Sequence, residues 1–243
     1  MPKRRKKFKK MLPGERPPCP DPGRYTWVQK RNGQGYWRLN RGTNKPATLN
    51  AVFQLNANNT AITNQAAKRV LAKLTPFTLP LLIRNSVSYI AGSFKRSLLV
   101  SEKMDYTDLA DFDFQEEDYA FNSLVKGRYQ IAIIDDMLHL SIGLGKGAVK
   151  RHSKLAEGYS VELIILFGDP ASDKTLRVDS TASEVYEFDD KDNPKLFNCL
   201  LSLQLPAKKP WMAMLKVSCE GRYVDEVAKY HAMKVVKVGN GFG

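Results

Sequence analysis

Several features that define common protein classes are missing from this sequence of 243 residues. No apolar run approaches the roughly 18–20 residues that a membrane-spanning helix needs. The lysine-rich N-terminus is not followed by the hydrophobic stretch of a signal peptide, because Phe8, Met11 and Leu12 stand among lysines and prolines. We therefore expect a cytoplasmic protein with no membrane partner.

Cysteine and histidine are scarce, with three of each. The cysteines form no C-x-x-C pair, and the histidines lack the i, i+4 spacing of a metal-binding helix. We expect Cys19, Cys199 and Cys219 to be free thiols, the last two buried; a Cys199–Cys219 disulfide is the alternative. Since G-x-S-x-G is also missing, the sequence predicts a protein that is not an enzyme and needs no metal or cofactor.

The positive charge is concentrated at one end of the chain. Residues 1–45 contain 14 Lys and Arg but only two Asp and Glu, a net formal charge of +12. Residues 46–243 contain 24 Lys and Arg and 23 Asp and Glu, a net of +1. A basic segment attached to a charge-balanced body is typical of an arm that binds polyanions.

The basic segment has three parts. Residues 1–10 carry seven basic side chains and no acid, which predicts a disordered arm, and the proline-rich residues 11–23 predict an extended linker. Residues 24–45 predict a β-hairpin, because two β-prone runs flank Asn32-Gly33-Gln34-Gly35. The candidate nucleic-acid-binding residues are Lys3, Arg4, Arg5, Lys6, Lys7, Lys9, Lys10, Arg24, Trp27, Lys30, Arg31, Tyr36, Trp37, Arg38 and Arg41.

Residues 46–120 are expected to form a helical segment with an acidic loop. Residues 47–74 look helical, and apolar residues at helical spacing predict a helix over at least residues 60–74, with Asn59 or Thr60 as its cap and Pro76 at its end. A second helix is expected from about Thr78, carrying an apolar stripe of Ile83, Val87, Ile90, Phe94 and Leu98. Eight acids follow within residues 102–118 and predict a charged surface loop, part of which could be a strand edge.

Residues 121–243 show the period of two that is typical of strands. Apolar residues alternate over 129–133, 138–144, 161–167, 197–205 and 211–219, and a last strand is expected at 234–238. About seven strands separated by turn signals favour an antiparallel β-sandwich. The expected fold class is therefore α+β: a basic arm and β-hairpin, a helical middle segment and a C-terminal antiparallel β-sandwich.

Two short motifs suggest chemistry and are better explained by structure. The segment Gly143-Leu144-Gly145-Lys146-Gly147 resembles a phosphate-binding loop, but Ser or Thr does not follow the lysine, so a hairpin loop is favoured. Asp135 and Asp136 could hold a divalent metal, but adjacent strand residues point to opposite faces, so a solvated turn is favoured. An enzyme built on these acids and the glycine loop is the least favoured hypothesis.

The layout from about Asn44 onward resembles a family of uncharacterised proteins that is widespread in Bacteroidota. The similar features lie in the segments 44–48, 74–81, 166–170 and 211–222. The resemblance implies an immunoglobulin-like C-terminal β-sandwich and carries no activity. The basic tail and aromatic hairpin depart from it.

These observations favour a non-catalytic protein that binds DNA or RNA through its basic arm and aromatic hairpin, because cations displace counterions from phosphates and aromatic faces stack on bases. The alternative is a structural assembly subunit, capsid-like or filament-forming, that forms a homo-oligomer through the edges of its β-sandwich or through its helices. An arm that binds an acidic protein surface also remains open.

Overall fold

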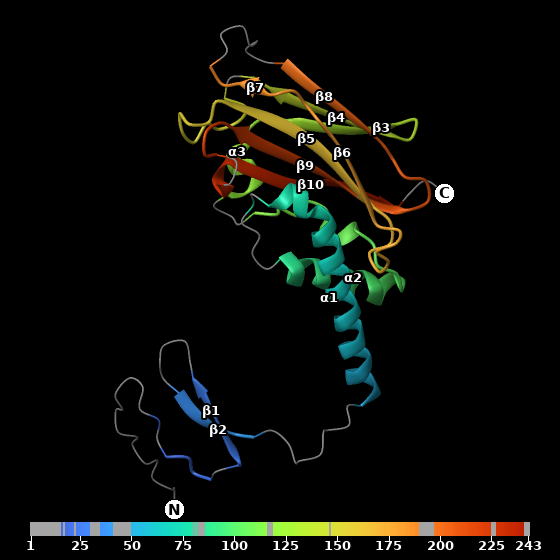
Figure 1. Ribbon diagram of the computed structural model, residues 1–243. Helices are drawn as coiled ribbons and strands as arrows, with labels where there is room; N and C mark the ends of the chain where they lie inside the picture. Colours follow the sequence, from blue (N-terminus) through green and yellow to red (C-terminus); the bar gives the residue numbers. More distant parts are fainter. Residues whose placement is uncertain are drawn as a thin grey trace, which may run out of the picture. The chain divides into compact units, whose positions relative to one another are not determined.

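The computed structural model describes residues 16, 18–21, 23–29, 35–40, 50–79, 81, 86–115, 119–145, 147–189, 197–224 and 227–240. Contacts divide the chain into two units, residues 1–53 and residues 54–243. The first unit contains a two-stranded antiparallel hairpin, β1 (Tyr25–Gln29) and β2 (Gly35–Leu39). The second contains helices and two antiparallel sheets, which confirms the α+β fold class (Figure 1).

Helix α1 (Ala51–Thr78) covers most of the expected range 47–74 and extends four residues beyond it. Its cap is Asn50, whose side-chain oxygen accepts a hydrogen bond from the Phe53 amide at 2.9 Å, so the prediction of a cap at Asn59 or Thr60 was wrong. The prediction that Pro76 ends the helix was wrong as well. Phe77 and Thr78 pack into the core beyond the proline, and this packing holds the last turn in place although Pro76 cannot donate its hydrogen bond.

Helix α2 (Ser86–Ser101) begins later than expected. Thr78 belongs to α1, and a turn at Leu79 and a bend at Leu81 separate the two helices, so a helix starting near Thr78 was a wrong prediction. Ile83 lies outside the described residues. The rest of the expected stripe lies on α2, with Ile90 and Phe94 fully buried. Across the described residues, neither helix is long and apolar enough to cross a membrane.

The acidic segment combines short helical turns with one β-bridge. It includes η1 (Thr107–Leu109) and is followed by α3 (Phe121–Leu124). Asp113 bridges to Lys234, and the Phe114 amide donates to the Met233 carbonyl at 3.0 Å, so part of the segment does run along a strand edge. The Asp113 carboxylate accepts bonds from the amides of Gln115 and Phe121, and burial is the main cause that raises its pKa.

Eight strands follow in the second unit. The smaller sheet has the order β3-β4-β8, and the larger has the order β10-β9-β5-β6 with β7 paired to β5. The strand bounds are β3 (Tyr129–Ile134), β4 (Met137–Leu144), β5 (Gly158–Phe167), β6 (Arg177–Ala182), β7 (Tyr186–Glu187), β8 (Phe197–Gln204), β9 (Pro210–Glu220) and β10 (His231–Asn240), with η3 (Ala228–Tyr230) just before the last. The sequence missed β6 and β7, whose few apolar residues leave no clear alternation.

The larger sheet is buried on both of its faces. Leu163 and Leu215 point into a core shared with the smaller sheet, together with Leu140. Their neighbours Ile164 and Met214 point into a second core, which is shared with α1 and α2. Figure 1 shows the helices on one side of the larger sheet and β3, β4 and β8 on the other. The second unit is thus built in three layers, held by two hydrophobic cores.

Candidate polyanion-binding surfaces

The hairpin divides the predicted aromatic residues between its two faces. Trp27 pairs with Trp37 across the strands, and their rings meet edge to face with centroids 5.2 Å apart. Side chains alternate along a strand, so Tyr36 and Arg38 lie on the opposite face. Gly35 lies beneath the Trp27 indole, where a β-carbon would collide with the ring. The tryptophan pair therefore stabilises the hairpin, and the other face presents an exposed tyrosine beside an arginine.

Polar contacts join the two strands of the hairpin at the end away from its turn. The Asn40 side chain donates to the Gly23 carbonyl at 2.9 Å, and the Asn40 amide donates to the Arg24 carbonyl at 2.6 Å. The Arg24 guanidinium lies 3.6 Å from the Asp21 carboxylate, but its side chain is 78% exposed, so this ion pair is weak. Arg24 keeps its charge near the open end of the hairpin.

Only part of the predicted binding set lies within the described residues. Arg24, Trp27, Tyr36, Trp37 and Arg38 are described, and the structure brings together Trp27 with Trp37. The remaining predicted residues lie outside the described residues; they are Lys3, Arg4, Arg5, Lys6, Lys7, Lys9, Lys10, Lys30, Arg31 and Arg41.

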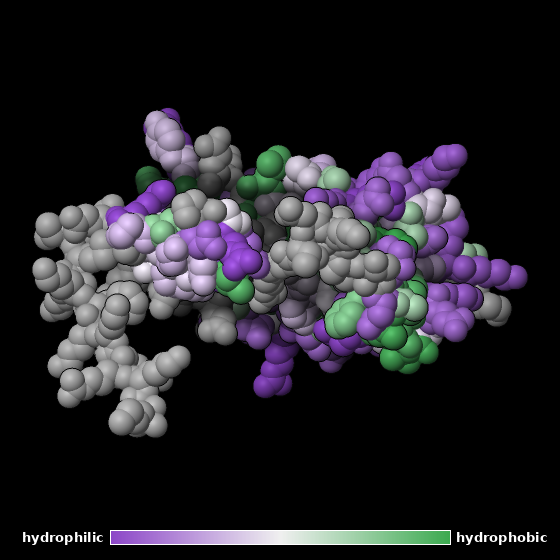
Figure 2. All heavy atoms as spheres, turned by 90° about the horizontal axis from the view of Figure 1, so that it is seen from below, coloured by the Kyte–Doolittle hydropathy of each residue, from purple (hydrophilic) through white to green (hydrophobic). Residues whose placement is uncertain are grey.

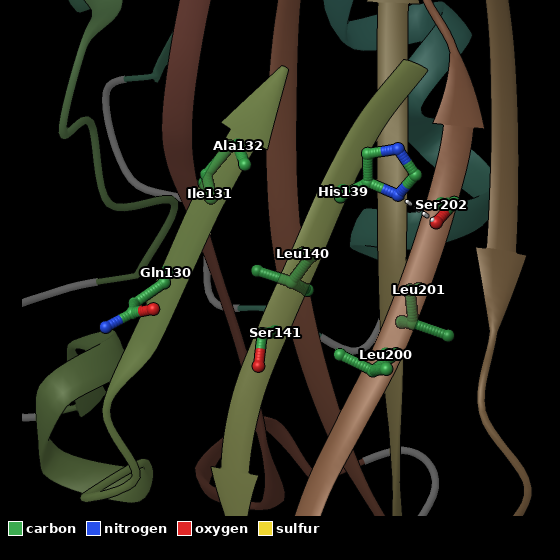
Figure 3. A pocket seen from close by; sticks show the side chains of 9 residues that line it. All are labelled: Gln130, Ile131, Ala132, His139, Leu140, Ser141, Leu200, Leu201 and Ser202. Atoms are coloured by element: carbon green, nitrogen blue, oxygen red, sulfur yellow. Dashed lines mark hydrogen bonds between the residues drawn. The ribbon is translucent and has the colours of Figure 1, made fainter. Parts of the chain in front are cut away.

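A shallow groove crosses the outer face of the smaller sheet, and the sequence did not predict it. It comprises two hollows of about 540 and 490 Å³ that share Gln130 and Ser141 in their walls. Along the central strand β4, the outward residues become smaller from His139 through Ser141 to Gly143. Larger side chains rise on both sides, because Gln130 of β3 and Leu200 of β8 flank Ser141 (Figure 3). We call this surface the β4 groove.

One end of the β4 groove is basic and rich in glycine. The hollow at this end is lined by Lys126 and Arg128, both exposed, and by Gly127, Gly143, Gly145 and Gly147, besides other residues. Gly127 is required there, because an added β-carbon would collide with the Gly143 carbonyl oxygen. Gly145 and Gly147 adopt positive φ angles of 140° and 85°. Lys146 lies outside the described residues.

The glycine segment is a loop between strands rather than a phosphate-binding loop. Instead of a helix, the chain that follows it forms a β-bridge between Val149 and Val125. A connecting loop in place of a phosphate-binding loop is thereby confirmed, but the expected hairpin was wrong, because β4 and the next strand, β5, lie in different sheets. Asp135 and Asp136 form the two-residue turn between β3 and β4 with φ angles of 48° and 61°, so the turn interpretation of these acids is confirmed too.

The other end of the groove contains a histidine–serine pair. Nδ1 of His139 and Oγ of Ser202 lie 2.7 Å apart and share a hydrogen bond (Figure 3). Among the residues that line the two hollows, none is Asp or Glu, so no lining carboxylate orients the imidazole as a nucleophile–base pair requires. The described residues contain no group of three or more metal-ligating side chains.

The cysteines are free thiols, as expected. Cys199 and Cys219 are buried in the core between the sheets. Burial raises the pKa of both, that of Cys219 to about 12, which keeps them protonated and unreactive. A neighbouring hydrogen bond from Tyr186 partly opposes the shift at Cys199. These thiols belong to the packing of the molecule.

Comparison with known proteins gives no relative: no protein-family model matches the chain, and no curated protein matches it significantly.

Proposed function

We propose that this protein binds nucleic acid as a non-catalytic polyanion-binding protein, through its basic N-terminal segment and aromatic hairpin. The observation that carries the proposal is the charge distribution. A net formal charge of +12 lies in residues 1–45 and only +1 in the remainder, so nearly all of the net positive charge belongs to the N-terminal segment. Polyanions with closely spaced charges gain most from such a segment, because each neutralised phosphate releases condensed counterions.

The hairpin geometry supports a contact with unpaired bases. Tyr36 is 45% exposed and shares its face with Arg38, so a base could stack on the phenol while the guanidinium meets a phosphate. Part of the ring surface of Trp27 and Trp37 lies in the contact between the two rings. Tyr36 and Arg38 are therefore candidates for the base contact beside the two tryptophans.

Salt-dependent binding tests this function. Fluorescence anisotropy would measure the affinity for labelled single-stranded DNA and RNA, each of about 20 nucleotides, at several salt concentrations. Full-length protein is expected to bind with a steep salt dependence, because each phosphate contact contributes about 0.7 to the slope of log K against log salt. Removal of residues 1–43 should remove most of that slope. Equal slopes for both proteins would contradict the proposal.

A matched pair of point variants tests the hairpin. Arg38→Gln should weaken binding and lower the slope by about 0.7. Lys103→Gln removes the same charge from an exposed position that follows α2 in the other unit, so it is expected to leave the slope unchanged. Identical effects of the two variants would show that net charge, and not the hairpin face, determines affinity.

Assembly is the second candidate function, and one observation favours it. Helix α1 exposes apolar side chains in its first two turns: Val52, Phe53 and Leu55 are 66%, 61% and 60% exposed. Such a surface is typical of helices that pack against another chain. Light scattering after size exclusion, without nucleic acid, separates the two functions. Large particles that persist after removal of residues 1–43 would favour assembly, whereas a small species would favour binding.

We further propose that β3 to β10 form an immunoglobulin-like β-sandwich, as the resemblance to the Bacteroidota family implies. Two antiparallel sheets with a common core support this proposal. It concerns the scaffold and adds nothing to the function.

A further inference from the structure

We propose that the β4 groove is a second nucleic-acid contact, which holds the phosphate backbone of a single strand without reading its bases. This inference rests on the proposed function and assigns it a site in the folded body, where the sequence alone indicated none. Four properties of the groove support it: its charge, its glycine-rich end, its lack of Phe, Tyr and Trp side chains and its length.

The charge of the groove is one-sided although the body as a whole is balanced. Residues 46–243 carry a net formal charge of only +1. The residues that line the two hollows nevertheless include Lys126 and Arg128 and contain no Asp or Glu. A balanced surface would place acids beside these cations. Their separation selects an anionic ligand.

The glycine-rich end lets a ligand approach the main chain. Gly143 and Gly145 carry no side chain above the sheet, so a phosphate could lie against the backbone between the two cations. The ammonium group of Lys126 donates to the Asn122 carbonyl and carries two further hydrogens with which it could meet a phosphate. Ser141 and Gln130 supply neutral hydrogen-bonding groups farther along. This combination of donors suits phosphate oxygens.

The lining residues of the groove include no Phe, Tyr or Trp, unlike the hairpin. The one aromatic ring among them is the imidazole of His139, which lies at the end away from the two cations and is held by its hydrogen bond to Ser202. Bases therefore gain little stacking contact at the basic end, and binding there should not depend on sequence. The groove runs from His139 on β4 to Gly145 just beyond it, six residue steps, which is about 20 Å at 3.4 Å per residue. That length corresponds to about six nucleotides at the 3.4 Å spacing of a stacked strand. A short single strand fits these dimensions.

The test uses full-length protein and a labelled single-stranded oligo-dT in the anisotropy assay. Lys126→Ser with Arg128→Ser removes both groove cations. Lys103→Ser with Lys174→Ser removes two exposed cations outside the groove and is the control for net charge. The groove variant should lower the salt slope by about 1.4 and weaken binding at least tenfold at low salt. The control should leave the salt slope unchanged and should change the affinity by no more than about a factor of two.

A second pair of variants tests the floor of the groove with two side chains of the same size, one charged and one neutral. Ser141→Asp places a carboxylate between Gln130 and Leu200, and Ser141→Asn places a neutral amide of the same size there. We expect the aspartate variant to bind at least fivefold more weakly than the asparagine variant, with matching circular dichroism spectra. Replacing oligo-dT by oligo-dA should change none of these ratios.

The outcomes separate this inference from the proposed function. If wild-type protein binds and both pairs of variants match their controls, the groove contact is refuted and the N-terminal contact stands. If wild-type protein does not bind, both proposals fall. A groove defect that depends on base identity would refute backbone recognition.

Discussion

Replacement of Ile164 by alanine tests the two-sided burial of the larger sheet. Ile164 lies on β5, is fully buried, and packs in the core beneath the helices. Its neighbour Leu163 is fully buried in the other core. A strand with one face in water would alternate buried and exposed side chains, and Ile164 would then tolerate alanine at little cost.

The structure predicts a large loss of stability instead. Truncation of a buried isoleucine to alanine removes its transfer free energy and leaves a cavity, which together cost about 2–5 kcal/mol. Leu163→Ala should cost a similar amount, because both side chains are inaccessible to water. Leu200→Ala is the control: Leu200 is 73% exposed on β8, and its truncation should change the free energy of unfolding by less than about 0.5 kcal/mol.

Urea unfolding followed by far-ultraviolet circular dichroism measures these differences. With a slope of about 2 kcal/mol per molar, the midpoint should move down by about 1–2.5 M for Ile164→Ala and for Leu163→Ala. Leu200→Ala should move the midpoint by less than about 0.25 M. If the midpoint of Ile164→Ala also lies within about 0.25 M of wild type, the three-layer arrangement is refuted.

Three further predictions follow from single groups. Native protein should react with a thiol reagent near pH 8 at one cysteine and denatured protein at all three, because burial protects two of them. The reactive thiol is that of the half-buried Cys19, and the protected ones are those of Cys199 and Cys219. Burial, and then two nearby lysines, lower the pKa of His152 from 6.5. The contribution of neutral His152 to stability is therefore present above pH 6.5 and is lost as the pH falls from 6.5 through the lower pKa of the folded protein. His152→Gln should for this reason flatten the pH dependence of the urea midpoint between about pH 7 and 5. An unchanged pH dependence would contradict this assignment. Gly35→Val should separate the Trp27 and Trp37 rings, and the expected result is loss of their exciton signal in circular dichroism; a retained signal would show that the hairpin does not need this glycine.

Sequence determined those features that depend on neighbouring residues. The hairpin strands β1 and β2 and the alternation along β4 were predictable, because a period of two is a local property of the chain. Charge counting located the basic segment for the same reason. The cores were half predictable: Leu163 was expected inside, whereas Ile164 required knowledge that helices cover the second face.

Tertiary structure alone decided the features that depend on which elements meet. Pro76 stays inside α1 because Phe77 and Thr78 find a core to pack against, and local propensity does not contain that core. The β4 groove exists because Gln130 and Leu200, 70 residues apart, flank Ser141 through strand pairing. Pairing between distant strands is set by the burial of whole faces, so a linear pattern cannot show which side chains will share a surface.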